Sequence, residues 1–235
     1  MLIVNADDMG ASPSTTDPVI ACFAAGTITS TSAMVWMPDT DRAAALARER
    51  DLPVGLHLNF TLPFGADVVP APVRARQLEV THLFTAPGAR PGDPHPGAAP
   101  LIAAAIADQL AQFRAQFGEP THIDGHHHIH VARAVLAQLP RSLPIRPPLH
   151  PDSGRPFGQR WLIRRFRGPA TCLAFERVHP ALGGEGLAVL EPARRQVVEV
   201  MVHPTQPAER AALDGPEWRQ ALDGLALGSY RDLPG

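Results

Sequence analysis

The stretch LIVNADD, residues 2–8, places three apolar residues shortly before two adjacent carboxylates. A short apolar run that ends in polar residues is typical of a strand buried inside a parallel sheet. We therefore predict a strand over residues 2–4, whose carboxyl end carries Asp7 and Asp8 into an opening. The same pair of aspartates also suits a helix cap or a solvated turn, so on its own it does not identify a site.

Strand and helix patterns alternate along the rest of the chain. Further strands are predicted at 31–36, 54–59, 121–124 and 197–202, with a short one around Ile145. One helix is predicted between a cap at Thr16 or Asp17, followed by Pro18, and Gly26; others are predicted over 39–50 and 101–117. This alternation predicts an α/β fold with a parallel sheet and an active site at the carboxyl ends of the strands, as in β/α barrels.

Two stretches interrupt the alternation. Residues 62–100 are rich in proline and glycine and show little periodicity, which predicts a long loop acting as a lid or a substrate wall. Residues 147–168 mix proline, glycine and arginine, which predicts a second insertion or a basic rim. We expect both to lie outside the regular sheet.

Length and charge limit what the protein can do. The chain has 235 residues, 45% of them hydrophobic and 19% charged, which suits a single domain over residues 1–235. Its net charge of -2 gives no basic field for nucleic acid or for a membrane surface, so we expect a neutral, polar substrate. We see no leader and no apolar run of about 20 residues, and we expect a cytoplasmic protein. Cys22 and Cys172 lie in apolar settings and are predicted to be buried thiols without a catalytic role.

Polar residues gather where four of the predicted strands end, in NADD (5–8), GLHLN (55–59), DGHHHIH (124–130) and MVHP (201–204). One carboxylate with two imidazoles is a usual ligand set for a catalytic divalent ion. Neighbours on a strand point to opposite sides, so one aspartate of the pair can bind an ion while the other acts as a base. Taken singly, His57 also suits a hydrogen-bonded core histidine and His203 a strand end, whereas four imidazoles within residues 126–130 are poor core formers.

The complete set of motifs resembles the YdjC-like carbohydrate deacetylases, the family of chitooligosaccharide deacetylase. The resemblance rests on LIVNADDMG (2–10), GLH (55–57), THIDGHHHIH (121–130), VEVMVHP (198–204) and GSYRD (228–232), which occur in the family's order. It implies a single-domain, distorted β/α barrel that removes an N-acetyl group from an amino sugar or a short N-acetylated oligosaccharide.

Site residues are carried over from this resemblance position by position. Asp8, His57 and His126 match the ligands of one divalent metal ion, zinc or magnesium, with manganese and cobalt as alternatives. Asp7 matches the catalytic base, and His203 matches the C-terminal histidine, which is suited to protonate the departing amine. His130 lies four residues after His126 and is an alternative ligand.

Several alternatives stay open on the sequence. Residues 64–100 and 147–167 do not resemble the family closely, so the sugar is not identified, and a homo-oligomer is compatible with the sequence. Arg146 either holds Asp7 or a substrate hydroxyl, or is a surface charge. Asp124 and the remaining histidines of the cluster are candidates for orienting the ligands. The competing functions are a metal-dependent hydrolase of another amide or of a phosphoester bond, and a sugar-binding relative without catalysis.

Overall fold

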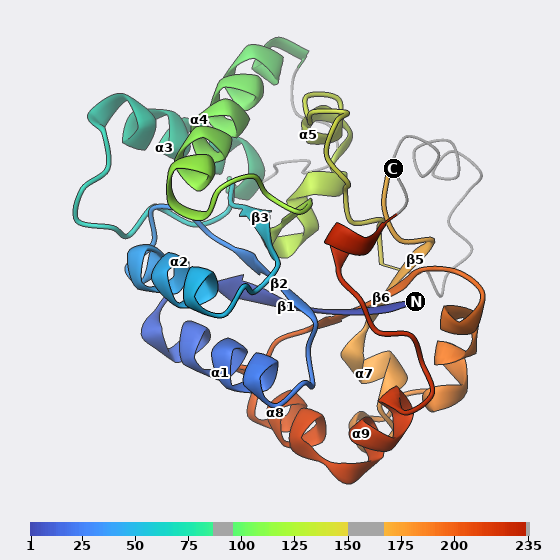
Figure 1. The fold of residues 1–235 in the computed structure, drawn as a ribbon. Helices are drawn as coiled ribbons and strands as arrows, with labels where there is room; N and C mark the ends of the chain where they lie inside the picture. The colour runs from blue at the N-terminus through green and yellow to red at the C-terminus, as the bar shows by residue number, and fades with distance from the viewer. Residues whose placement is uncertain (87–95, 150–166, 234–235) are drawn as a thin grey trace.

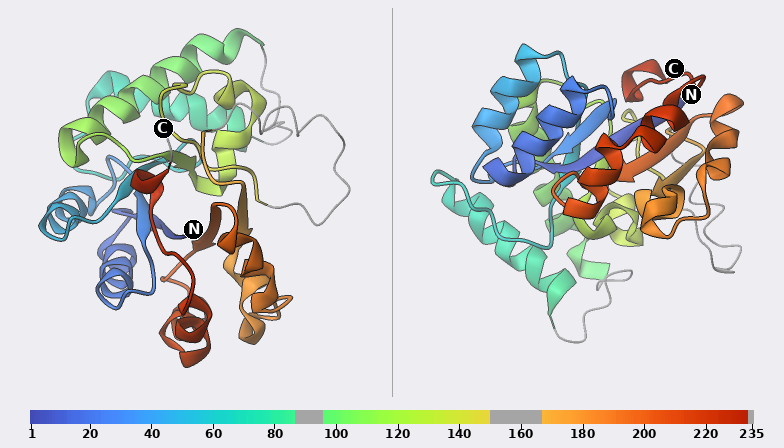
Figure 2. Two further views of the ribbon diagram at one scale, coloured as in Figure 1. Left: turned by 45° about the vertical axis from the view of Figure 1, so that its right-hand side comes forward. Right: turned by 90° about the horizontal axis from the view of Figure 1, so that it is seen from below.

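Six parallel strands form the sheet of this protein in a computed structural model that describes residues 1–86, 96–149 and 167–233. The strand order is β4-β3-β2-β1-β6-β5, and the sheet is curled with helices around it (Figures 1 and 2). The strands are β1 (Leu2–Met9), β2 (Ser30–Ala33), β3 (Val54–Leu58), β4 (Ile123–Gly125), β5 (Thr171–Ala174) and β6 (Val198–Val202). The predicted α/β fold, a distorted β/α barrel of parallel strands, is confirmed.

The segment between residues 145 and 149 bridges the two edges of the sheet. Ile145 pairs with Ile123 of β4, and Leu149 pairs with Cys172 of β5. The strand predicted around Ile145 is therefore present as isolated bridges. A side chain at residue 168 would disturb the bridge at Ile145, because a Cβ added to Gly168 would clash with the carbonyl oxygen of Ile145.

Helices pack around the sheet, and their apolar faces join the strands in the core. In the described residues they are α1 (Pro13–Ala24), α2 (Thr40–Glu49), α3 (Ala71–Thr85), α4 (Ala99–Phe117), α5 (Arg133–Leu136), α7 (Phe175–Val178), α8 (Pro207–Asp214) and α9 (Pro216–Leu222). Short 3₁₀ helices cover Pro96–Ala98, His126–Val131, Pro180–Leu182, Leu187–Arg194 and Tyr230–Asp232. Within these ranges, no helix has both the length and the apolar character needed to cross a membrane.

The start of α1 differs from the prediction. Ser12, rather than Thr16 or Asp17, is the N-cap, and its side chain accepts a hydrogen bond from the backbone N–H of Thr15. Pro13 takes the first helical position, so Pro18 lies inside the helix. The Ser-Pro pair at 12–13 is the stronger start signal because it supplies both a cap and a first-turn proline.

The predicted loop over 62–100 is wrong for its central part, which forms α3. Proline and glycine are concentrated at the ends of that window, while residues 73–85 contain neither. Gln77, Val80 and Phe84 are the buried residues of α3, and the Gln77 side-chain amide donates to the carbonyl oxygens of Asn59 and Leu62. The helix therefore anchors the chain after β3. Most of the 147–168 segment lies outside the described residues.

Candidate functional site

β1 carries both aspartates within its last residues and does not end before them. Its pairing with β2 shifts register between Ala6 and Met9, and Asp8 takes a left-handed backbone conformation with φ 69°. A strand that is irregular at this point turns consecutive side chains toward different neighbours. The division of Asp7 from Asp8 was predicted from regular alternation, but the structure produces it through this bulge.

Asp8, His57 and His126 meet at the carboxyl ends of β1, β3 and β4. Asp8 Oδ1 lies 2.9 Å from His126 Nδ1 and 3.1 Å from His57 Nε2. Asp8 and His126 are partly exposed, at 20% and 16% of their side-chain surface, whereas His57 is buried. The group can hold a metal ion, because bonds of about 2.1 Å to one divalent ion place neighbouring ligand atoms about 3 Å apart.

Asp124 orients His57 from inside the sheet. The register of β3 and β4 pairs His57 with Asp124, and His57 Nδ1 lies 2.8 Å from Asp124 Oδ1 and 3.1 Å from the Ser32 hydroxyl. This contact leaves Nε2 directed at Asp8. A carboxylate on the far nitrogen of a metal-binding imidazole fixes its orientation and raises its basicity, so the arrangement is the one a metal-binding histidine needs.

The charges of this group favour a cation. Burial raises the pKa of Asp8, but hydrogen bonds from His126 and His57 outweigh it and hold that pKa well below its usual 3.8. Burial lowers the pKa of His57, but the neighbouring Asp124 and Asp8 carboxylates raise it well above 6.5. The shift of Asp8 shows that its carboxylate is held ionised, and the shift of His57 shows that the neighbouring carboxylates favour positive charge at this position.

Arg146 occupies the interior of the barrel next to this group. Its guanidinium is 0% exposed and contacts Asp7 at 2.6 and 2.7 Å, Asp124 at 2.7 Å and Glu199 at 2.8 Å. The alternative that Arg146 is a surface charge is wrong, and its predicted contact with Asp7 is present. One arginine thus joins carboxylates from β1, β4 and β6.

Arg146 also explains why Asp7 differs from Asp8. Burial raises the pKa of Asp7, but the charge of Arg146 outweighs it and lowers that pKa below 3.8. Asp7 further accepts hydrogen bonds from Asn5 at 3.0 Å and Ser32 at 3.3 Å. Asp7, His57 and Asp124 form a second group with metal-ligand spacing, but Arg146 already provides the cation for its two carboxylates.

His203 follows β6 on the same edge of the sheet. Ala6 of β1 pairs with Val202, the last residue of β6. Asp7 and His203 each follow one member of this pair. The His203 side chain is 26% exposed, and its Nδ1 faces Glu209 Oε1 at 3.7 Å. The structure therefore brings all five predicted residues, Asp7, Asp8, His57, His126 and His203, to one end of the barrel.

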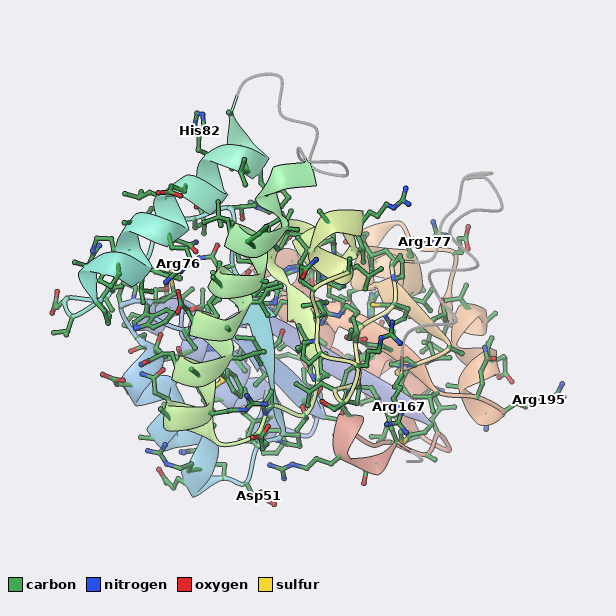
Figure 3. All side chains as sticks on the ribbon, turned by 90° about the horizontal axis from the view of Figure 1, so that it is seen from above. Asp51, Arg76, His82, Arg167, Arg177 and Arg195 are labelled. Atoms are coloured by element: carbon green, nitrogen blue, oxygen red, sulfur yellow. The ribbon has the colours of Figure 1, made fainter. Side chains whose placement is uncertain are left out.

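The other histidines of the 126–130 cluster differ in environment. His130 is fully buried, and burial lowers its pKa to about 3. It is not a member of the described groups with metal-ligand spacing. His127 and His128 have left-handed backbone conformations in the 3₁₀ helix, and the His127 ring packs on His126 at 4.0 Å. His82, in contrast, projects from the outer end of α3 (Figure 3).

Sequence reasoning gave no role to two buried residues behind the site. Glu199 accepts a hydrogen bond from Arg146, and the Tyr230 hydroxyl donates to its other oxygen. The Tyr230 ring stacks on His122 with centroids 3.7 Å apart. The signal for Glu199 is a single carboxylate inside the apolar strand 197–202, because such a group needs a buried partner.

Comparisons with known proteins show which family the chain resembles. Residues 1–224 match the family described as YdjC-like protein. A mouse (Mus musculus) protein named carbohydrate deacetylase is 37% identical over 149 residues, which cover 60% of this chain and 46% of that protein. A Yersinia pestis (strain Pestoides F) protein named chitooligosaccharide deacetylase is 30% identical over 266 residues, covering 99% of this chain and 98% of that protein.

A solved structure supports the fold. A putative cellobiose-phosphate cleavage protein from Enterococcus faecalis V583 superposes with a TM-score of 0.72 at 22% identity, covering 100% of this chain and 98% of that one. The family match extends over nearly the whole chain, and the Yersinia relative aligns from end to end. Together with the motifs at the strand ends, these matches identify the chain as a member of the YdjC-like protein family.

Proposed function

We propose that this protein is a metal-dependent N-deacetylase of an amino sugar or a short N-acetylated oligosaccharide, releasing acetate. The observation that carries the proposal is the convergence of Asp8, His57 and His126 beside Asp7 and His203. The names of the mouse and Yersinia relatives support the reaction and the class of substrate.

The donor set suits one divalent ion held by Asp8, His57 and His126. When bound, such an ion lowers the pKa of a coordinated water toward about 7 and polarises the acetyl carbonyl. Two imidazoles favour zinc, while the carboxylate and the open positions also suit magnesium, manganese or cobalt. The partial exposure of Asp8 and His126 leaves room for water and substrate on that side.

Asp7 acts as the base in this proposal. Because its pKa is lowered, it is ionised at neutral pH and can accept a proton from the attacking water. Arg146, Asn5 and Ser32 hold the carboxylate in one orientation, so little reorganisation is needed when the proton arrives.

His203 acts as the acid. His203 follows β6, which lies next to β1, the strand that carries Asp7. The two residues therefore lie at the same edge of the sheet. An amine is a poor leaving group unless it is protonated, and an imidazolium is a suitable donor near neutral pH. The exposed part of its ring gives it access to substrate.

The environment of Arg146 favours amide hydrolysis over phosphoester hydrolysis. A phosphate carries negative charge that an arginine usually clamps, but Arg146 is already engaged with three carboxylates and is fully buried. A sugar-binding protein without catalysis needs no candidate metal-binding group next to an oriented carboxylate, Asp7, and an imidazole, His203. The presence of all three features supports an enzyme.

The deciding experiment measures acetate release from a panel of N-acetylated mono- and disaccharides, with and without a chelator. We expect release from at least one sugar, loss of release with the chelator and recovery on adding a divalent ion. Undiminished activity in protein shown by elemental analysis to lack metal would contradict the metal dependence. Binding of a sugar without acetate release would favour the non-catalytic alternative.

A further inference from the structure

We propose that Glu209, on α8, is a positioning residue that fixes both the backbone and the ring of His203. The inference rests on the proposed function, in which His203 protonates the leaving amine, and adds the residue that controls this acid. Both carboxylate oxygens of Glu209 face the same residue, His203.

The contacts are made by the two ends of one carboxylate. Glu209 Oε2 accepts the backbone N–H of His203 at 2.7 Å, and Oε1 faces the ring Nδ1 at 3.7 Å. Glu209 is only 4% exposed, although it lies in the first turn of a short helix near the end of the chain. Holding the Nδ1 side of the ring leaves Nε2 as the nitrogen that can reach substrate.

Capping of α8 does not account for this burial. A glutamate at the third helical position commonly accepts a hydrogen bond from the N-cap backbone, and here the N-cap is Gln206. Glu209 instead contacts His203, three residues before the N-cap, and α8 has no side-chain cap. The carboxylate therefore ties the turn after β6 to α8.

Charge supports the same role. Burial lowers the pKa of His203, but the nearby carboxylate of Glu209 and the negative charges of Asp7 and Asp8 raise it above 6.5. Among the described residues, Glu209 on α8 is the carboxylate in contact with this ring, and Asp7 and Asp8 on β1 act on it by their charge. Since Asp7 is paired with Arg146 and Asp8 faces two imidazoles, Glu209 is the carboxylate dedicated to His203.

The test compares Glu209→Gln with Glu217→Gln in the metal-loaded protein. The glutamine side chain can still accept the His203 N–H through its amide oxygen, but it removes the negative charge that faces the ring. Glu217 is the matched control, because it is an exposed glutamate in the first turn of the neighbouring helix α9. The primary measurement is the NMR titration of the His203 imidazole, assigned by its absence in His203→Ala.

We expect the His203 titration and the alkaline limb of kcat to move to lower pH in Glu209→Gln, with KM unchanged. Activity on the alkaline side should fall up to about tenfold, the change that one pKa unit produces. Glu217→Gln should match the original protein. Glu209→Ala should also lower kcat at the pH optimum, because the turn loses its backbone contact.

An unchanged His203 titration in folded Glu209→Gln would overturn the proposal. The imidazole titration does not depend on a substrate. Absence of acetate release from every sugar would therefore count against the proposed function and would leave the decision on Glu209 to the titration.

Discussion

Two carboxylate clusters lie side by side at the end of this barrel, and they obtain their positive charge in different ways. The inner cluster, Asp7, Asp124 and Glu199, surrounds Arg146 and is fully enclosed. The outer cluster, Asp8 with His57 and His126, is partly exposed and contains no arginine or lysine. The first takes its cation from the chain itself, whereas the second suits a cation from solution.

The two adjacent aspartates therefore differ in the source of their positive partner. Both carboxylates have a lowered pKa, and burial opposes ionisation in both. A buried carboxylate is stable only when a partner offsets the cost of removing it from water. Arg146 gives Asp7 a permanent partner, so Asp7 is held in place, while Asp8 is free to bind an exchangeable ion.

The largest effect is expected from Arg146→Met, which removes the cation of the inner cluster. Three buried carboxylates would then lack their partner, and breaking one buried pair alone costs about 3–5 kcal/mol. We expect a loss of unfolding free energy at least this large, or failure to fold, measured by urea denaturation at neutral pH. The loss should become smaller as the pH falls, because protonated carboxyl groups no longer need the arginine.

Arg231→Met is the control for that experiment. Arg231 pairs with Asp51 at the molecular periphery, where Asp51 is labelled in Figure 3, and both side chains are exposed. Exposed pairs contribute about 0–1 kcal/mol, so this variant should unfold almost like the original protein. Equal destabilisation by the two substitutions would mean that the inner cluster does not depend on its arginine.

The next effect separates Asp7→Asn from Asp8→Asn. Asp7→Asn should keep the ion but lower turnover by about 10²–10⁴-fold, because an amide cannot accept the proton of water. Asp8→Asn should weaken metal binding, since a neutral oxygen replaces a charged ligand, and excess metal should recover part of its activity. Bound metal and acetate release are measured for both variants over a range of metal concentrations.

The outcome of this pair can also reverse the assignment. Equal loss of metal in both variants would place both aspartates in the ligand set. Metal loss in Asp7→Asn alone would exchange the two roles and would mean that the Arg146 contacts rearrange when an ion binds.

The strands that carry the outer cluster could be predicted because their signals are local, while the choice of Asp8, His57 and His126 came from the resemblance to the family. The predicted strands at 54–59 and 121–124 agree with β3 and β4 to within two residues, whereas β1 runs to Met9, beyond the predicted 2–4. Parallel strands bring such ends together whatever the connections are. The α3 helix was missed because proline and glycine at the ends of the 62–100 window hid a helix-forming run in its middle.

The inner cluster could not be derived in this way. Arg146 lies in an irregular segment, and its partners are 139 residues away in Asp7 and 53 residues away in Glu199. No periodicity in the sequence connects these positions. β5 was missed for a related reason, because Thr171–Ala174 is only four residues long.

A smaller effect is expected from metal binding to the outer cluster. An ion that binds only the folded protein, at 100 times its Kd, adds about 2.7 kcal/mol to the unfolding free energy. For a chain of 235 residues this corresponds to roughly 5–10 °C in Tm. The increase should be smaller in Asp8→Asn and unchanged in Asp7→Asn, measured by thermal denaturation of chelated and metal-loaded samples. An equal increase in all three proteins would mean that the ion binds elsewhere.

The smallest effect is expected from Tyr230→Phe, which tests how far the inner cluster extends. Tyr230 donates to the Glu199 oxygen that Arg146 does not use, and its ring stacks on His122, so phenylalanine removes the hydrogen bond and keeps the stacking. Hydrogen bonds to charged groups contribute about 1.5–3 kcal/mol, and Arg146 still contacts Glu199, so we expect a loss of about 1.5 kcal/mol. Metal affinity should stay unchanged, because in the described part of the chain Tyr230 contacts Glu199 and His122 and no residue of the outer cluster. Urea denaturation and metal titration measure the two quantities, and a loss of metal affinity would mean that the clusters are coupled through Arg146 and Asp124.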